Sequence, residues 1–532
     1  ARGWPVVLTG YIEALYATGA TSVAGRRVVQ CRRGVRQGDP LSSVLFNVVM
    51  DHVLKSLPTR VGYILRGHRW SRMAFADDVV LVSASEVGMR TMTRDLIGAL
   101  GECGLRLNGA KSLYIPLVPR GGRLVVPDEA NLNELGIAKA TADEEWRYLG
   151  IRFTPYGVKR PPIREFLDRV DRVADSRLRP LQKLEALRTY VVPGFLHQLV
   201  LMDPNGKMLR QFDIGVRRAL RRCLRLPGDV PNAFFYAPIK DGGLGFMPME
   251  TTIPDLIVNR TGVARGMLFG EESLPASTTL ERSRRRAEEW HGKADGKAMA
   301  KARQVPESCA WVKDDMSQEQ EWRTLAALKT FSGAIPTRVR CLRGRSGIET
   351  CRRGCPDRET AGHIIQACPQ MRRARCKRHN AVVNLLAKYA EKKGMRVWVE
   401  TRIVVDGIGI QPDLIVMVGE AAYVIDVAIT ADTLEHPSED VFRGKALKYG
   451  SSAVVEAVTE LTSSGNVSCI PAVLTWRGVW LKKSAVQLRK VYPAFILGWA
   501  AKRTVDGSGF IWASYMRIDS SRAPLLGPSQ GQ

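Results

Sequence analysis

Two adjacent carboxylates, Asp77 and Asp78, are the first side chains whose type and spacing could do chemistry. Apolar residues precede them at 73–76 and follow them at 79–82, a pattern that predicts a buried hairpin with the acids at its tip. Carboxylates this close repel each other, and a hard cation with oxygen ligands relieves that repulsion. The pair therefore predicts a magnesium or manganese site, with a plain acidic turn as the alternative.

A second pair of carboxylates, Asp413 and Asp426, lies in two β-rich runs on either side of Gly419 and Glu420. The pattern predicts a β-hairpin. If Gly419 and Glu420 form a two-residue turn, the two acids face each other with Cβ atoms about 5 Å apart. Either of two lysines, Lys445 or Lys448, could then supply a base or a neutralising charge. A second divalent metal site is predicted here, the alternative being a surface hairpin with two unrelated acids.

Three cysteines and a histidine form a third constellation, with the pattern C-x3-C-x7-H-x4-C. Its members are Cys351, Cys355, His363 and Cys368. Thiolates and an imidazole in a four-ligand set predict structural zinc, although four incidental side chains remain the alternative. Cys376 and His379 are spare ligand candidates. Between Arg338 and Arg378, twelve Lys or Arg outnumber three Asp or Glu, which predicts phosphate binding with little sequence readout.

The elements that must position these groups divide the chain into a multidomain α/β and α+β protein. The expected parts are a first domain with strands and helices, a helical region, a charged linker, a cysteine and histidine knuckle, and a final domain, at residues 1–155, 156–270, 271–335, 336–380 and 381–532. Four arginines of the helical region recur at helical spacing and predict one basic face. They are Arg217, Arg218, Arg221 and Arg222.

Composition favours a nucleic-acid partner. The 532 residues include 79 Lys plus Arg and 53 Asp plus Glu, a formal net charge of +26. A balance this basic points to a polyanion. No apolar run reaches about 18 residues and the first residues carry no secretory pattern, so we expect a soluble, intracellular chain without membrane contact. Ten cysteines in such a chain predict reduced thiols and a metal site.

Ordered motifs in the first domain resemble the palm of reverse transcriptases. They are a Gly and Pro loop at residues 36–43 running into an apolar helix, Phe75–Asp78, Gly104–Asn108 followed by Lys111, and Trp146–Ile151. The resemblance implies that Gln37 and Gly38 line the template and nucleotide pocket. It also implies that Asp77 and Asp78 bind catalytic Mg²⁺ or Mn²⁺, that Lys111 lies near the incoming triphosphate, and that Trp146–Ile151 grips the primer.

One part of the palm is missing from this resemblance. The family needs a third carboxylate on an earlier strand, and before Asp39 the only acid is Glu13, in a stretch with a helical pattern. We therefore expect the chain to begin inside a polymerase domain and, as written, not to polymerise.

The second acidic pair resembles the core of restriction-like PD-(D/E)XK endonucleases. Pro412 and Asp413 are followed after twelve residues by Asp426 and then by a displaced lysine, as in the variant of site-specific non-LTR retrotransposons. Lys445 or Lys448 would be that lysine, and Glu400 could supply a further acid.

The order of palm, helical thumb, CCHC zinc knuckle and restriction-like endonuclease domain resembles the polyprotein of non-LTR retrotransposons of the R-two type. Such proteins nick genomic DNA and extend the freed 3′ hydroxyl on element RNA. The resemblance implies element RNA and genomic, ribosomal DNA as partners, Mg²⁺ or Mn²⁺ and Zn²⁺ as cofactors, and action in the nucleus. Two alternatives are a decayed or domesticated nucleic-acid-binding fragment and a protein like group II intron maturases, whose His-rich nuclease pattern is absent.

Overall fold

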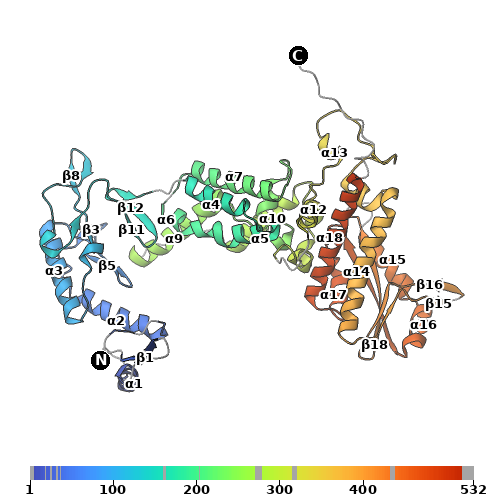
Figure 1. The fold of residues 1–532 in the computed structure, drawn as a ribbon, viewed down its shortest axis with the longest axis horizontal. Helices are drawn as coiled ribbons and strands as arrows, with labels where there is room; N and C mark the ends of the chain where they lie inside the picture. Colours follow the sequence, from blue (N-terminus) through green and yellow to red (C-terminus); the bar gives the residue numbers. More distant parts are fainter. Residues whose placement is uncertain are drawn as a thin grey trace, which may run out of the picture. The chain divides into compact units, whose positions relative to one another are not determined.

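The computed structural model describes residues 5–517 except for short gaps at 18–19, 24–26, 31–33, 36–37, 160–162, 203, 270–277, 314–319, 406 and 432–437. It divides into two compact units, Ala1–Lys159 and Arg160–Gln532 (Figure 1). No helix in these described residues is both long and apolar enough to cross a membrane.

The first unit combines three helices with short strands. The helices are α1 (Val6–Ala17), α2 (Pro40–Ser56) and α3 (Glu86–Glu102). Asp39 is the N-cap of α2: its carboxylate accepts a hydrogen bond from the Leu41 N–H at 2.9 Å, and Pro40 occupies the first helical position. Buried side chains of α2 and α3, Met50, Val53 and Leu96 among them, make a small core. Glu13 lies in α1, as its helical pattern predicted.

The strands of this unit pair mainly with their sequence neighbours. Antiparallel hairpins join β1 (Ala20–Val23) to β2 (Arg27–Gln30), β3 (Tyr63–Leu65) to β4 (His68–Trp70), β5 (Arg72–Phe75) to β6 (Asp78–Leu81), and β8 (Val118–Arg120) to β9 (Arg123–Val125). A three-stranded meander contains β11 (Trp146–Tyr148), β12 (Ile151–Thr154) and β13 (Gly157–Val158), and β7 (Leu113–Tyr114) runs parallel to β10 (Ala138–Lys139).

The second unit opens with a helical region. Its helices are α4 (Ile163–Ala174), α5 (Pro180–Glu185), α6 (Leu196–Met202), α7 (Gly206–Cys223), α8 (Asn232–Tyr236) and α9 (Met249–Phe269). Phe166 of α4 packs edge-on against Phe195 and Phe212, with ring centroids 4.6 and 4.4 Å apart. These three buried rings tie α4 to α7 across the intervening chain.

The predicted linker at 271–335 is wrong for residues 279–312 and 320–335. These residues form α10 (Thr279–His291), α11 (Glu307–Ala310) and α12 (Glu321–Phe331). Trp290 and Phe331 are fully buried in the same core as Phe234. Few large apolar residues are needed to hold α10 in the core, because its charged side chains lie on the solvent face. A capping box of Thr278 and Glu281 stabilises the start of the helix.

The predicted basic face of α7 is also wrong, because residues at i and i+4 share a face whereas neighbours at i and i+1 do not. Arg217 and Arg221 turn inward, where Arg217 donates to the Tyr236 hydroxyl at 2.5 Å. Arg222 points to α4 and pairs with Asp171 and Asp175. Three of the four arginines therefore hold helices together.

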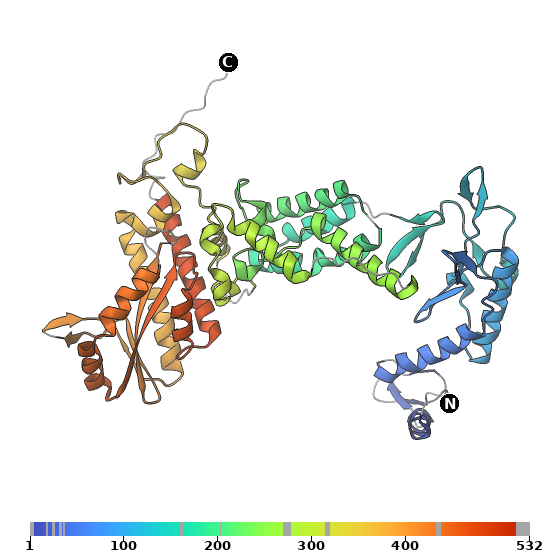
Figure 2. The same cartoon turned by 180° about the vertical axis from the view of Figure 1, so that it is seen from behind.

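The last part of the chain is a four-stranded sheet covered on both faces by helices (Figures 1 and 2). The strand order is β14 (Val397–Val399), β17 (Leu414–Val418), β18 (Ala421–Thr430) and β19 (Asn466–Thr475), with only β18 and β19 parallel. On one face pack α14 (Arg372–Lys392), α17 (Lys482–Leu488) and α18 (Ala494–Arg517), and on the other α15 (Ser438–Tyr449) and α16 (Ser452–Thr462).

Helix α14 runs through the domain boundary that the sequence placed after residue 380. It begins shortly after Cys368 and ends at Lys392, and the C-terminal helix α18 packs along it. Short α13 (Arg338–Cys341) precedes the cysteine and histidine segment. Residues 336–380 and the sheet thus belong to one continuous fold rather than to separate domains.

The burial of Trp290 gives a test of the core that replaces the predicted linker. We expect Trp290→Ala to lower the free energy of unfolding by about 3–5 kcal/mol, since it empties a large, fully buried site. Urea unfolding of the full chain measures the loss. Arg284→Ala on the same helix is the control, because the Arg284 side chain is 73% exposed. Equal, small effects of both substitutions would mean that α10 is not part of the core.

Candidate functional site

The hairpin of β17 and β18 has the register that the sequence predicted. Val418 pairs with Ala421, so Gly419 and Glu420 form the two-residue turn, and the ladder continues to the pair Leu414 and Ile425. Asp413 directly precedes this last pair and Asp426 directly follows it. The turn therefore brings the two acids to neighbouring positions on the sheet.

The two carboxylates are held by different partners. One oxygen of Asp413, Oδ2, accepts the backbone N–H of Val427 at 2.6 Å, and the other, Oδ1, lies 3.0 Å from Nε2 of His379 on α14. Asp426 is only 4% exposed and forms an ion pair with Nζ of Lys445 on α15. A buried carboxylate requires such a partner, because an unpaired charge in the interior is strongly unfavourable.

Of the two candidate lysines, only Lys445 reaches the acids. Burial lowers the pKa of the Lys445 ammonium, while the negative charge of Asp413 opposes that shift. Lys448 is exposed and its Nζ lies 4.8 Å from the centre of the Tyr449 ring. The geometry favours Lys445, because its partly buried side chain reaches Asp426 from α15 whereas the side chain of Lys448 is exposed.

Two further residues adjoin the pair. Glu400 donates its backbone N–H to the Asp413 carbonyl at 3.0 Å, but its side chain is exposed. His379, which the sequence offered as a spare zinc ligand, contacts Asp413 instead. Sequence reasoning missed this role because nothing in the spacing links residue 379 to residue 413. The contact depends on the packing of α14 against the sheet.

The cysteine and histidine array comes together as the spacing predicted. One ligand atom from each of Cys351, Cys355, His363 and Cys368 lies within 4.8 Å of the others. Nδ1 of His363 lies 3.3 Å from Oδ2 of Asp357, whereas its Nε2 is buried and has no hydrogen-bond partner among the described residues. A carboxylate on one ring nitrogen leaves the other nitrogen available as a ligand, which is the usual arrangement of a metal-binding histidine.

A buried network supports this array from behind. The Tyr515 hydroxyl of α18 lies 3.0 Å from Cys351 Sγ and donates to Glu359 at 2.8 Å. Glu359 is fully buried and also receives two hydrogen bonds from the Arg352 guanidinium, at 2.8 and 2.7 Å. The array is therefore fixed to the C-terminal helix. Cys376 is exposed and is not part of the four-ligand cluster.

The first acidic pair lies at the tip of its hairpin, as predicted, but the hairpin is not buried. Phe75 pairs with Asp78, so Ala76 and Asp77 form the turn, with Ala76 in the left-handed region at φ +53°. Both acids are exposed, and so is Phe75, at 65%. Val79 and Leu81 of β6 pack against the core of α2 and α3, whereas the tip of the hairpin has no such cover among the described residues.

A cavity of about 620 Å³ adjoins this hairpin within the first unit. Asp78, Lys111 and Trp146–Tyr148 line it together, although they are far apart in the sequence. Burial raises the pKa of the Tyr148 hydroxyl, and the charge of Asp78 adds to the shift. Asp77 is not part of the lining. Gly38 is exposed at φ +88°, and Gln37 lies outside the described residues.

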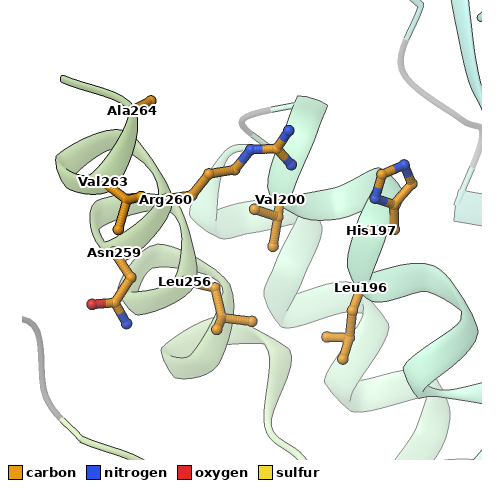
Figure 3. A pocket seen from close by; sticks show the side chains of 8 residues that line it. All are labelled: Leu196, His197, Val200, Leu256, Asn259, Arg260, Val263 and Ala264. Carbon is orange, nitrogen blue, oxygen red and sulfur yellow. The ribbon is translucent and has the colours of Figure 1, made fainter. Parts of the chain in front are cut away.

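A second hollow, of about 590 Å³, lies between α6 and α9. Leu196 and Val200 line it from α6, and Leu256 and Val263 from α9 (Figure 3). No carboxylate or thiol is among the residues that line it, and His197 and Arg260 supply its only ionisable groups. It lacks the paired acids that mark the other sites.

Comparison with known proteins gives consistent matches. Residues 5–153 match the family model described as reverse transcriptase (RNA-dependent DNA polymerase). The chain is 30% identical to the Retrovirus-related Pol polyprotein from type-1 retrotransposable element R2 of Nasonia vitripennis, over 91% of this chain and 49% of that protein. It is also 30% identical to the corresponding polyprotein from the type-2 element R2DM of Drosophila melanogaster, over 92% and 49%.

A third relative, a Pol polyprotein from a type-1 R2 element of Popillia japonica, is 30% identical over 58% of this chain and 73% of its own length. The chain spans about half the length of the Nasonia and Drosophila relatives.

Glu359 gives a test of the network behind the cysteines. Burial alone would raise the pKa of Glu359, but hydrogen bonds from Arg352, Arg338 and Tyr515 outweigh it and hold that pKa below its ordinary value. The carboxylate therefore stabilises the fold above its unfolded pKa of about 4.3, and this contribution is lost as the pH falls through the lower folded value. We expect Glu359→Gln to cost about 3–5 kcal/mol of unfolding free energy at pH 7 and less below pH 4.

Urea unfolding at several pH values measures both effects. The matched control is Glu349→Gln in the same segment, whose carboxylate pairs with Arg358 at the surface. A surface pair contributes about 1 kcal/mol or less. A cost for Glu359→Gln as small as the control, or one that does not change with pH, would contradict the network.

Proposed function

This chain belongs to the family of R2 retrotransposon Pol polyproteins, and from that premise we propose that it is the reverse transcriptase and endonuclease part of such a protein. In this proposal it nicks one strand of genomic DNA and uses the freed 3′ hydroxyl to prime reverse transcription of element RNA. The main support for the endonuclease activity is the pair of carboxylates Asp413 and Asp426 with Lys445 beside it.

Charge supports a metal-dependent nuclease at this pair. Two carboxylates meet one lysine, so negative charge remains after Lys445 has paired with Asp426. Both oxygens of Asp413 already have partners, which fixes that carboxylate in one orientation. Magnesium or manganese held by Asp413 and Asp426 would supply an activated water and neutralise charge on the scissile phosphate. Lys445 would orient Asp426 and add positive charge beside the phosphate.

The cysteine and histidine cluster supports structural zinc. Its donor set of three sulfurs and one imidazole suits Zn²⁺, and all four positions come from protein, which leaves no open site for substrate. The unpartnered Nε2 of His363 supports the same conclusion. We propose a CCHC zinc knuckle that is built into the fold of a restriction-like endonuclease.

The first unit supports the polymerase half. We propose that Asp77 and Asp78 hold the catalytic divalent metal, that Lys111 contacts the triphosphate, and that Gln37 and Gly38 contact template and nucleotide. The shared cavity of Asp78 and Lys111 favours this assignment.

The partners follow from the same family. We propose element RNA and a genomic DNA target as partners, with ribosomal DNA as the target and the nucleus as the place of action. A group II intron maturase is not favoured, since the relatives are R2 polyproteins. A decayed fragment that only binds nucleic acid is disfavoured by the acidic pair, whose buried charges and partners are all in place.

Plasmid nicking tests the nuclease. We expect the chain to nick supercoiled plasmid with Mg²⁺ or Mn²⁺, and we expect Asp413→Asn and Asp426→Asn to abolish nicking because a metal ligand is lost. Lys445→Ala should lower the rate by about 100-fold or more. Lys448→Ala is the matched control and should leave the rate near that of the unaltered chain. Gel separation of nicked and supercoiled DNA measures each rate. Normal nicking by both aspartate variants would contradict the proposal that Asp413 and Asp426 form the nuclease site.

Metal analysis tests the knuckle. We expect about one zinc per purified chain and its loss in His363→Ala. Asp357→Ala should weaken zinc affinity by about 10- to 100-fold, because the imidazole loses the carboxylate that orients it. Competition with a zinc chelator measures this change. Cys376→Ser is the control and should keep its zinc; loss of zinc in that variant with retention in His363→Ala would contradict the ligand set.

A further inference from the structure

A small hairpin lies beside the acidic pair and contributes none of the metal-site residues proposed above. It consists of β15 (Ile403–Val405) and β16 (Ile408–Ile410), and it projects from the sheet near α16 (Figures 1 and 2). Ile403 and Val405 are 6% and 8% exposed and share a core with Val454 and Val458 of α16. One face of the hairpin is therefore anchored to the domain.

The base of the hairpin is joined to the acidic pair. The chain returns from Ile410 to Asp413 in three residues. Before the hairpin, Glu400 donates its N–H to the Asp413 carbonyl at 3.0 Å, and the Gln411 side chain donates to the Glu400 carbonyl at 2.6 Å. These bonds hold the two ends of the hairpin together at the residue that would bind metal. A DNA strand cut at Asp413 and Asp426 must pass close to it.

The side of the hairpin away from α16 is open. Val404 is 64% exposed and pairs with Gly409, which has no side chain. The guanidinium of Arg402 lies over this bare backbone, since a Cβ on Gly409 would meet Arg402 Nε at 2.2 Å. Ile408 pairs with Val405 and therefore lies on the other face, but it is beside the turn and is 68% exposed. The Arg402 side chain is exposed, and no carboxylate among the described residues forms an ion pair with it.

We propose that this open face, formed by Arg402 and Val404 and flanked by the exposed Ile408 beside the turn, binds the duplex DNA next to the bond that is cut. Arg402 contacts a phosphate, and the two apolar side chains pack against the sugar and base edges of the groove. The inference rests on the proposed nuclease function of Asp413 and Asp426. It adds a DNA-contacting element outside the metal site that holds the substrate in place.

Three features favour DNA over a protein partner. The apolar surface consists of two side chains, which is small for a stable protein interface. An exposed arginine beside it matches a phosphate backbone, and exposed aliphatic side chains are a known means of contacting base steps in a groove. The anchored inner face and tied base also keep the hairpin in one position, so little ordering is needed on binding.

Salt-dependent DNA binding tests the proposal. A fluorescent 30-base-pair duplex is titrated with chain carrying Asp426→Asn, which prevents cleavage, at several salt concentrations. Adding Arg402→Ala should weaken binding and reduce the slope of log affinity against log salt by about 0.9, the value of one phosphate contact. Val404→Ser with Ile408→Ser should weaken binding without changing the slope. Gly409→Ala should reproduce part of the Arg402→Ala effect, because its methyl group displaces the guanidinium while the charge remains.

Lys490→Ala, an exposed cation that precedes α18 on the other side of the sheet, is the control and should match the parent. Parental affinity and slope in all hairpin variants would overturn the hairpin proposal while leaving the nuclease intact. A change of oligomeric state in sedimentation, with DNA binding unaltered, would also overturn it by assigning the face to a second copy. Failure of the unaltered chain to nick plasmid would instead remove the proposed function on which the inference rests.

Discussion

The proximity of two carboxylates on one sheet is the constraint on which the C-terminal fold depends. Asp413 and Asp426 are brought together by a two-residue turn, and Asp426 is buried. Such a pair is tolerated only when positive charge and hydrogen bonds compensate it. Lys445 from one helix layer and His379 from the other supply part of that compensation. Both layers of the domain thus converge on one strand pair, and the remaining negative charge is what a divalent cation would neutralise.

The cysteine and histidine cluster is tied to the same strands. Gln366, between His363 and Cys368, donates to the Ile429 carbonyl at the end of β18 and accepts from Arg378 of α14 at 2.7 Å. Arg378 also donates to Ser508 of α18 at 2.8 Å. In this arrangement the cysteine and histidine segment leads into α14, and α14 carries the histidine that contacts Asp413. The knuckle and the acidic pair are parts of one folded unit.

Local features were predictable from the sequence and long-range ones were not. The register of the Asp413 hairpin follows from its turn, and the four-ligand cluster follows from its spacing, because both depend on nearby residues. The contact between His379 and Asp413 depends on how α14 packs, which no local pattern encodes. The charged stretch around Trp290 suggested a linker because few apolar residues occur there, yet one buried tryptophan anchors it. Phe75 led to the opposite error. The apolar residues beside Asp77 suggested a buried hairpin, yet Phe75 is exposed because no other element covers it among the described residues.

The proposed metal site at Asp413 and Asp426 can be tested most directly by locating a bound divalent ion. Crystals of the chain soaked in manganese and measured at a wavelength where manganese scatters anomalously would show each bound ion. We predict an anomalous peak within about 2.0–2.6 Å of carboxylate oxygens of both Asp413 and Asp426, the range for hard divalent cations. Fully ordered carboxylates without a peak between them, under conditions in which the chain nicks DNA, would contradict it.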